Sequence, residues 1–259
     1  MRVPSVTGLG KHVPTPSRRT KDAMKGIPKI RSLSDAVDVA MELPATRVDE
    51  YTRKLIASHP DASIADLQAI ATRTYISRAG TLSGVVGASA AIPGTGTAVA
   101  TTLTAGELST FYLNTTLYVL TMAELQGVPA TDLDQRRLLV STSLLGEEGA
   151  KLVSDQLGLS SLAWARSQLK HLSSPTLRSV NKALTKYAAK RTAKTASRRM
   201  VGRLLPFGLG AAVGYFSGRK IAQTVVEGIR TSLGDAPAGT GADVLARMNA
   251  NQPAVETTR

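Results

Sequence analysis

Hydrophobic residues recur along most of this 259-residue chain at the three- and four-residue spacing of amphipathic helices. Between residues 63 and 92 the spacing is carried by Ile64, Leu67, Ile70, Ala71 and Ile76. No run of alternating β-branched residues bounded by turn residues predicts a strand. The pattern therefore predicts an all-α fold, a multi-helix bundle. The expected helices cover residues 32–43, 46–59, 63–92, 97–125 and 131–158, a short piece around 164, a long basic helix from 173, and 207–233.

Capping and helix-breaking residues set the expected borders of these helices. Ser63, followed three residues later by Asp66, has the spacing of a capping box. Prolines at positions 44, 60 and 206 interrupt the pattern, because proline lacks the N–H group that a helix interior needs. Pro93 and Gly94 divide an apolar, glycine-rich stretch. The two arms of that stretch are therefore expected to form a glycine-rich helical hairpin.

Composition divides the chain into three parts. Residues 1–33 hold eight basic residues, one acid and several prolines and glycines, which predicts a disordered basic N-terminal arm. Residues 34–233 carry the helical pattern and form the expected domain. Residues 234–259 are rich in Gly, Ala, Pro and Thr, and we expect a flexible C-terminal tail there.

No charged residue occurs in residues 79–106, a run of 28 positions. A membrane-spanning helix needs about 20 mostly apolar residues, and the turn leaves each arm too short to cross. Small residues spaced by four share one helix face and allow another backbone to approach. Packing inside a bundle and shallow insertion into lipid are the two alternatives. The residues assigned to helix packing or lipid contact are Gly80, Gly84, Ala88, Pro93, Gly94, Gly210, Gly214 and Gly218.

The helix expected after the turn carries a narrow polar stripe. Glu107, Asn114 and Tyr118 fall within one arc at 100° per residue. Glu107 and Asn114 are candidates for a buried polar site, because a buried acid needs a hydrogen-bonding partner. The alternative is that the stripe faces water or forms a polar seam between helices.

Positive charge is concentrated in the C-terminal half of a chain whose net charge is +13. Residues 156–226 contain no acid. The long basic helix in this range is expected to be amphipathic, with a separate apolar side formed by Leu177, Val180, Leu184 and Tyr187. Basic residues spaced by four are neighbours on a helix and repel one another, and an anion would relieve that repulsion. The candidates are an anionic membrane surface, a nucleic-acid backbone, or a solvated basic face without a partner. The residues assigned to membrane or phosphate binding are Arg178, Lys182, Lys186, Lys190, Lys194, Arg198, Arg199 and Arg203.

Two segments resemble the EcsC family. Residues 84–128 are similar to the central part of that family, a glycine-rich helix, a proline turn and a helix with an early acid, where Glu107 takes the acidic position. Residues 198–229 look like its C-terminal signature, a proline followed by a glycine-rich helix. The resemblance covers about residues 35–233. It implies a helical, membrane-associated protein without an established activity, whose namesake is associated with a transporter operon.

No arrangement of residues predicts catalysis. His12, His59 and His171 are scattered, the chain has no cysteine, and no G-x-S-x-G motif occurs. We therefore expect a non-enzymatic protein without cofactor or metal, lying in the cytoplasm on the inner face of the cell membrane. Its expected partners are anionic lipid headgroups and a membrane protein such as a transporter. The alternative is sequence-independent binding of nucleic acid through the basic helix and tail.

Overall fold

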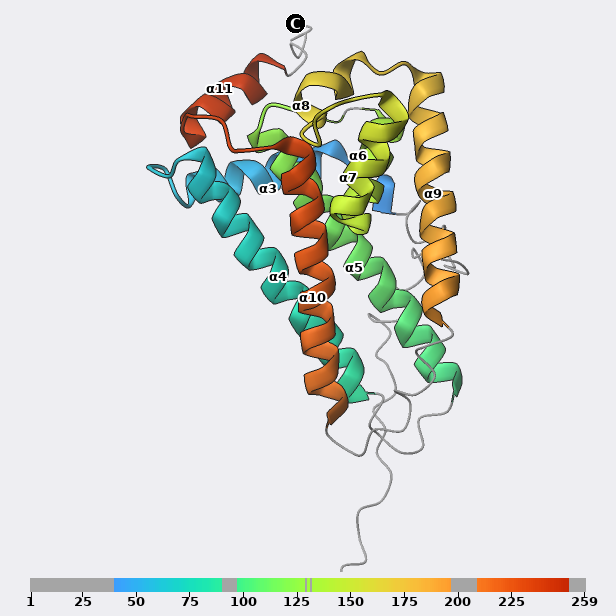
Figure 1. The fold of residues 1–259 in the computed structure, drawn as a ribbon. Helices are drawn as coiled ribbons and strands as arrows, with labels where there is room; N and C mark the ends of the chain where they lie inside the picture. Colours follow the sequence, from blue (N-terminus) through green and yellow to red (C-terminus); the bar gives the residue numbers. More distant parts are fainter. Residues whose placement is uncertain (1–39, 90–96, 129, 131, 197–208, 252–259) are drawn as a thin grey trace, which may run out of the picture. The chain divides into compact units, whose positions relative to one another are not determined.

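The computed structural model describes residues 40–89, 97–128, 130, 132–196 and 209–251. Most of these residues are helical and none of them forms a strand (Figure 1), so the expected all-α fold is confirmed. An isolated β-bridge joins Ser63 and Thr240. The α-helices described are α3 (Ala45–Ala57), α4 (Ile64–Ser89), α5 (Thr97–Leu125), α6 (Leu133–Leu145), α7 (Glu147–Leu157), α8 (Ala165–Gln168), α9 (Ser174–Ala196), α10 (Leu209–Leu233) and α11 (Gly241–Ala250), and the 3-10 helix η1 (Leu169–His171) follows α8.

The core lies where α5, α6 and α10 meet. Between Tyr118 and Leu125 every residue of α5 except Glu124 is buried, and α6 buries Leu138, Leu139 and Val140 completely. In its C-terminal half, neighbours therefore cover both the expected polar stripe of α5 and the side opposite it. Helix α4 packs on α5 and on α10, while α9 packs mainly on α6. The resulting bundle holds α9 at one edge (Figure 1).

Helices α4 and α10 run antiparallel and approach closely at two glycines. A Cβ atom added at Gly218 would lie 2.6 Å from the carbonyl oxygen of Ala79 and 2.6 Å from Cβ of Ser83. A Cβ added at Gly80 would lie 2.8 Å from Cγ of Arg219. Because both glycines meet the opposite helix, the structure places these members of the expected small-residue set at a helix-packing contact.

The helix expected over residues 131–158 is two helices. Gly146 ends α6 and begins α7 with φ of 70°, a backbone conformation that side chains disfavour. Helix α10 crosses at this break, where a Cβ added at Gly228 would lie 2.9 Å from Cα of Gly146. The break therefore allows α6 and α7 to follow different directions past one crossing helix.

The chain beyond residue 233 is not the flexible tail that its composition predicts, at least as far as residue 250. Thr240 and Asp243 form a capping box at the start of α11, which buries Val244 and Met248. Arg247 Nη2 donates a hydrogen bond to the Leu125 carbonyl at 3.1 Å. The small, polar composition that predicted a tail includes these capping residues. The expected arm at residues 1–33 and the end of the expected tail at 252–259 lie outside the described residues.

The expected capping box at Ser63 is confirmed. The Asp66 backbone N–H donates to Ser63 Oγ at 3.1 Å, and the Ser63 backbone N–H donates to the Asp66 carboxylate at 3.3 Å. The Ser63 hydroxyl also donates to the Asp66 carboxylate, at 2.6 Å. This bond, and after it the bond from the Ser63 backbone N–H, lowers the pKa of Asp66. The start of α4 is thus set by residues adjacent in sequence.

Replacing Gly218 with alanine tests the close approach of α10 to α4. In an exposed helix the change would stabilise by about 1 kcal/mol, but here the added methyl meets Ala79 and Ser83. Overpacking costs about 1–3 kcal/mol, so we expect a net loss of up to about 2 kcal/mol in unfolding free energy by urea denaturation. The control, Ser217→Ala at the neighbouring exposed position, should change it by less than about 0.5 kcal/mol. A Gly218→Ala protein more stable than the parent would contradict the packing.

Candidate functional site

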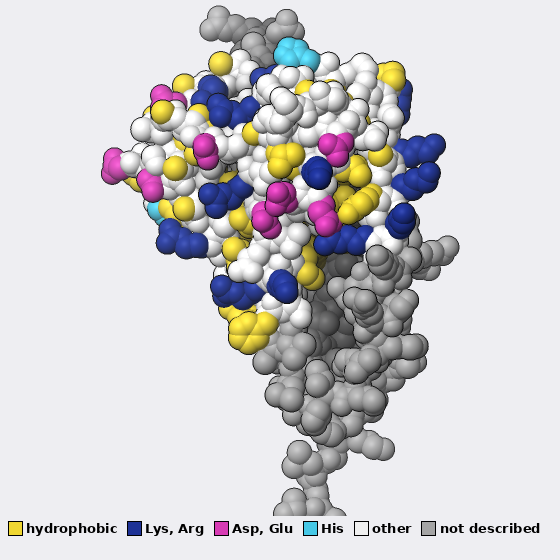
Figure 2. Space-filling model, in the orientation of Figure 1, with side chains coloured by type: hydrophobic (Ala, Val, Ile, Leu, Met, Phe, Trp, Pro, Cys, Tyr) yellow, Lys and Arg dark blue, Asp and Glu magenta, His cyan; other side chains and the backbone are white. Residues whose placement is uncertain are grey.

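Four basic residues of α9 form one cationic face, which we call the α9 cationic face. Arg178, Lys182, Lys186 and Lys190 are all exposed, and none of them forms an ion pair with a described residue. Figure 2 shows dark blue Lys and Arg side chains along the edge where Figure 1 places α9, whereas the magenta acidic side chains lie toward the middle of the view and at the opposite edge. The face thus presents positive charge without a described acid to neutralise it.

Helical geometry explains why this face points outward. Four residues advance a helix by about 6 Å and about 40°, so the four cations extend over about 18 Å and about 120°. The centre of that arc lies almost opposite the residues that α9 buries, Leu177, Val180 and Leu184. Packing on α6 therefore leaves the α9 cationic face directed to solvent.

The apolar side of α9 belongs to the bundle. The sequence suggested an amphipathic helix that could rest in a membrane, but Leu177, Val180 and Leu184 are each at most 2% exposed. Asn181 lies beside them and donates to the Asp134 carbonyl at 2.9 Å. An interfacial helix needs its apolar face free to enter lipid. The part of α9 whose side chains are described, residues 174–191, therefore offers its cations for electrostatic contact and keeps its apolar side in the bundle.

A salt bridge that the sequence did not reveal joins α9 to α7. Arg191 Nη1 lies 2.6 Å from Glu148 Oε2, and the Tyr187 hydroxyl donates to the same oxygen at 2.9 Å. Glu148 therefore fixes the side of α9 that carries Arg191, about 100° beyond the last cation of the face.

For several predicted residues the structure describes the helix that holds them but not the side chain. Lys194 lies in α9, Ala88 in α4, Glu107 in α5, and Gly210 and Gly214 in α10, but only their backbone is described. Gly84 lies half-buried in α4. The residues that lie outside the described part are Pro93, Gly94, Arg198, Arg199 and Arg203.

Asn114, the other buried polar candidate, lines a polar seam between α4 and α5. Tyr75 and Tyr118 stack there with ring centroids 4.3 Å apart and planes 3° apart. The Tyr75 hydroxyl bonds to Thr115 Oγ1 at 2.8 Å, and the Tyr118 hydroxyl bonds to Thr72 Oγ1 at 3.0 Å. Asn114 and Tyr118 thus lie along a seam between α4 and α5.

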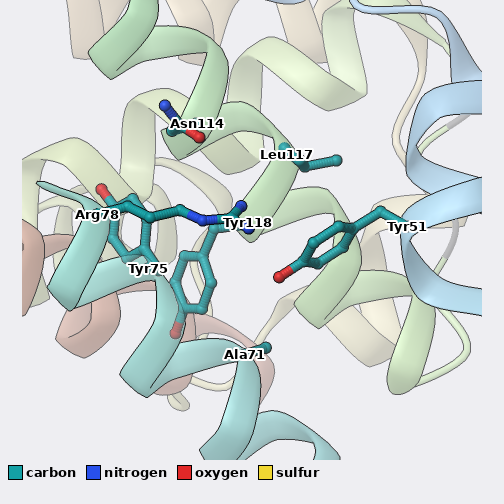
Figure 3. A pocket seen from close by; sticks show the side chains of 7 residues that line it. All are labelled: Tyr51, Ala71, Tyr75, Arg78, Asn114, Leu117 and Tyr118. Atoms are coloured by element: carbon teal, nitrogen blue, oxygen red, sulfur yellow. The ribbon is translucent and has the colours of Figure 1, made fainter. Parts of the chain in front are cut away.

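Two small recesses open along this seam. The inner recess is lined by Tyr51, Ala71, Tyr75, Arg78, Asn114, Leu117 and Tyr118 (Figure 3). The outer recess is lined by Ser77, Arg78, Thr81, Leu82 and Asn114. The inner one has a volume of about 10 Å³, close to the space that one water molecule needs, and the outer one has about 310 Å³. Arg78 and Asn114 belong to both.

At one end of the bundle, the terminal segments of α4, α5 and α10 contain no charged residue. The register of Gly80 against Tyr215 and of Gly218 against Ser83 brings the end of α4 beside the start of α10. Figure 1 shows α5 beginning, and α9 ending, toward the same end. We call residues 79–89, 97–106 and 209–218 the uncharged end. Among the described residues no helix is both long enough and apolar enough to cross a bilayer.

A partly buried acid lies elsewhere than the sequence suggested. Burial, and then repulsion from Asp49, raises the pKa of Glu124, while Arg247 and Arg53 act in the opposite direction. This cluster lies where α3, α5 and α11 meet, and the sequence did not reveal it because its members are far apart along the chain.

The described residues contain no group of three or more His, Cys, Asp or Glu placed to hold a metal ion.

Comparisons with family models, curated proteins and solved structures give no match for this chain. The resemblance to the EcsC family therefore stays a prediction.

The buried tyrosines predict a loss of stability at alkaline pH. Burial raises the pKa of Tyr118 to about 12 and also raises the pKa of Tyr75, above the ordinary value of 10.0. The folded protein then keeps protons that the unfolded chain releases. Its stability should be full below pH 10 and fall as the pH rises toward about 12, by up to about 1.4 kcal/mol per pH unit for each tyrosine. Urea unfolding at stepped pH measures the slope, and Tyr118→Phe should make it shallower. Equal slopes in parent and variant would contradict this explanation.

Proposed function

We propose that this protein is a non-enzymatic, peripheral membrane protein that binds anionic lipid headgroups through the α9 cationic face. The observation that carries the proposal is the set of four exposed cations, Arg178, Lys182, Lys186 and Lys190, without an ion-pair partner among the described residues. Like charges one turn apart repel. An anionic surface relieves this repulsion, and each basic residue near such a surface contributes about 1 kcal/mol.

The uncharged end supports a lipid surface as the anion. A membrane offers headgroups and acyl chains together, and α9 ends toward the uncharged end (Figure 1). Phe216, at this end of α10, is 69% exposed, and Lys220 follows it one turn later on the same side. An exposed aromatic ring beside a cation is typical of residues at a membrane–water interface. This combination gives lipid the advantage over other polyanions.

Nucleic acid is the second candidate, and the structure of α9 favours it in one respect. The apolar side of α9 is covered by the bundle, so the face offers only phosphate contacts, as in sequence-independent binding to a nucleic-acid backbone.

The resemblance to the EcsC family favours the membrane and adds a membrane protein, such as a transporter, as a proposed partner. Under this proposal the protein acts in the cytoplasm at the inner face of the membrane.

Neutralising the α9 cationic face tests the proposal. The variant Arg178→Gln/Lys182→Gln/Lys186→Gln/Lys190→Gln should lose affinity for vesicles that contain anionic phospholipid. At about 1 kcal/mol per charge the loss is about fivefold per residue and several-hundred-fold for four at most. Co-sedimentation with anionic and with neutral vesicles measures the effect. Salt at about 1 M, where the Debye length is about 3 Å, should release the parent protein.

A matched control removes the same charge from scattered positions. Arg47, Lys54, Arg73 and Lys151 are exposed on α3, α4 and α7, and their replacement by glutamine changes the net charge by the same four units. This control should keep most of the vesicle affinity. Equal losses in the two variants would show that net charge alone acts, and stronger binding to duplex DNA than to anionic vesicles would favour the second candidate.

A further inference from the structure

The two recesses at Arg78 have the chemistry of an anion site. Arg78 is exposed on α4, and its described contact is with the ring of Tyr51, 5.9 Å from the ring centroid. Figure 3 shows its side chain reaching across the inner recess toward Tyr51. Contact with an aromatic face occupies the plane of a guanidinium but leaves its N–H groups free to donate. Arg78 has no ion pair with a described acid.

The floor beneath Arg78 is rigid. Tyr75 and Tyr118 stack on each other, and their hydroxyls are already bonded to Thr115 and Thr72. Both hydroxyls are therefore occupied within the seam, and their hydrogen bonds hold the two rings in place beneath Arg78. Because this floor is already ordered, less conformational entropy of the protein is lost when a ligand binds.

The outer recess adds a side-chain amide, two hydroxyls and one leucine to the site. Asn114 Nδ2 donates to the Thr110 carbonyl at 2.9 Å, which leaves the amide oxygen as an acceptor. Ser77 and Thr81 lie on the rim, and the Thr81 hydroxyl donates to the Ser77 carbonyl at 3.1 Å. Leu82 contributes an apolar wall. The outer recess is shallow and largely open to solvent, so a small molecule bound there would keep part of its surface in water.

We propose that this pair of recesses binds a phosphate or carboxylate carried on a molecule with a short apolar part. The anion faces Arg78, whose fork of N–H groups matches two oxygens. A hydroxyl on or beside the anion donates to the Asn114 amide oxygen, and the apolar part lies against Leu82. The site is separate from the α9 cationic face and needs no contact with it.

Binding of small soluble probes tests the site directly. The probes are hexyl phosphate, hexanoate, inorganic phosphate and hexanol, titrated against the full chain and followed by amide chemical shifts in NMR. Hexyl phosphate or hexanoate should shift residues around positions 77–82 and 114, and hexanol should not. Arg78→Gln should raise the dissociation constant at least about tenfold, as expected when a charged hydrogen bond is lost.

Three variants make the result decisive. Arg73→Gln removes an exposed arginine from the same helix outside both recesses and should leave the dissociation constant within about twofold. Ser77→Phe keeps Arg78 but fills the rim, and it should weaken binding as Arg78→Gln does. The variant that neutralises the α9 cationic face should bind the probes normally. Equal weakening by Arg73→Gln, or no saturable binding of either anionic probe, would overturn the proposal.

A vesicle arm identifies the source of the anion. Vesicles with phosphatidic acid are compared with vesicles of equal charge whose anionic lipid is phosphatidylglycerol. If Arg78→Gln weakens binding only to phosphatidic acid, the site takes a lipid phosphate monoester. If it weakens hexyl phosphate binding and leaves both vesicles unchanged, the site takes a soluble ligand. Both outcomes support an anion site at Arg78, and a variant that alters neither measurement excludes it.

Discussion

The close crossing of α10 over α4 and over the α6–α7 junction is the constraint on which the rest of the structure depends. At Gly218 and Gly228 the neighbouring backbone is so near that a methyl group would meet main-chain atoms. Glycine in a helix costs about 1 kcal/mol relative to alanine, and these contacts offset that cost through backbone packing. The crossing places the uncharged ends of α4 and α10 side by side. It also fixes α6, on which α9 packs.

The position of α6 decides what α9 can do. Leu177, Val180 and Leu184 are buried against the bundle, and Arg191 is held by Glu148 of α7. These contacts define the orientation of α9 about its own axis and leave one arc for Arg178, Lys182, Lys186 and Lys190. Because the backbone of α9 is already ordered, binding to an anionic surface costs no further backbone entropy at these four positions. The packing of apolar residues thus arranges the charges that we assign to binding.

Much of the fold could be predicted from the sequence because its signals are local. The spacing of Leu177, Val180 and Leu184 and the capping pair Ser63 and Asp66 involve residues within one or two turns. What could not be predicted depends on partners distant along the chain. The break at Gly146 depends on the crossing of α10, and the stacking of Tyr75 on Tyr118 brings together two helices. The two candidate sites differ in the same way. The spacing of the basic residues on α9 is visible in the sequence, whereas the recesses at Arg78 arise only when α4 packs on α5.

The central claim is that the α9 cationic face, rather than the net charge of the chain, meets an anionic membrane. The chain has no cysteine, so one introduced cysteine carries a unique spin label. A label at position 182 on this face should lose mobility and become less accessible to a water-soluble paramagnetic reagent when anionic vesicles are added, whereas a label at position 54 on α3 should not change. Equal changes at the two positions, or none at position 182 while the protein is bound, would contradict the account.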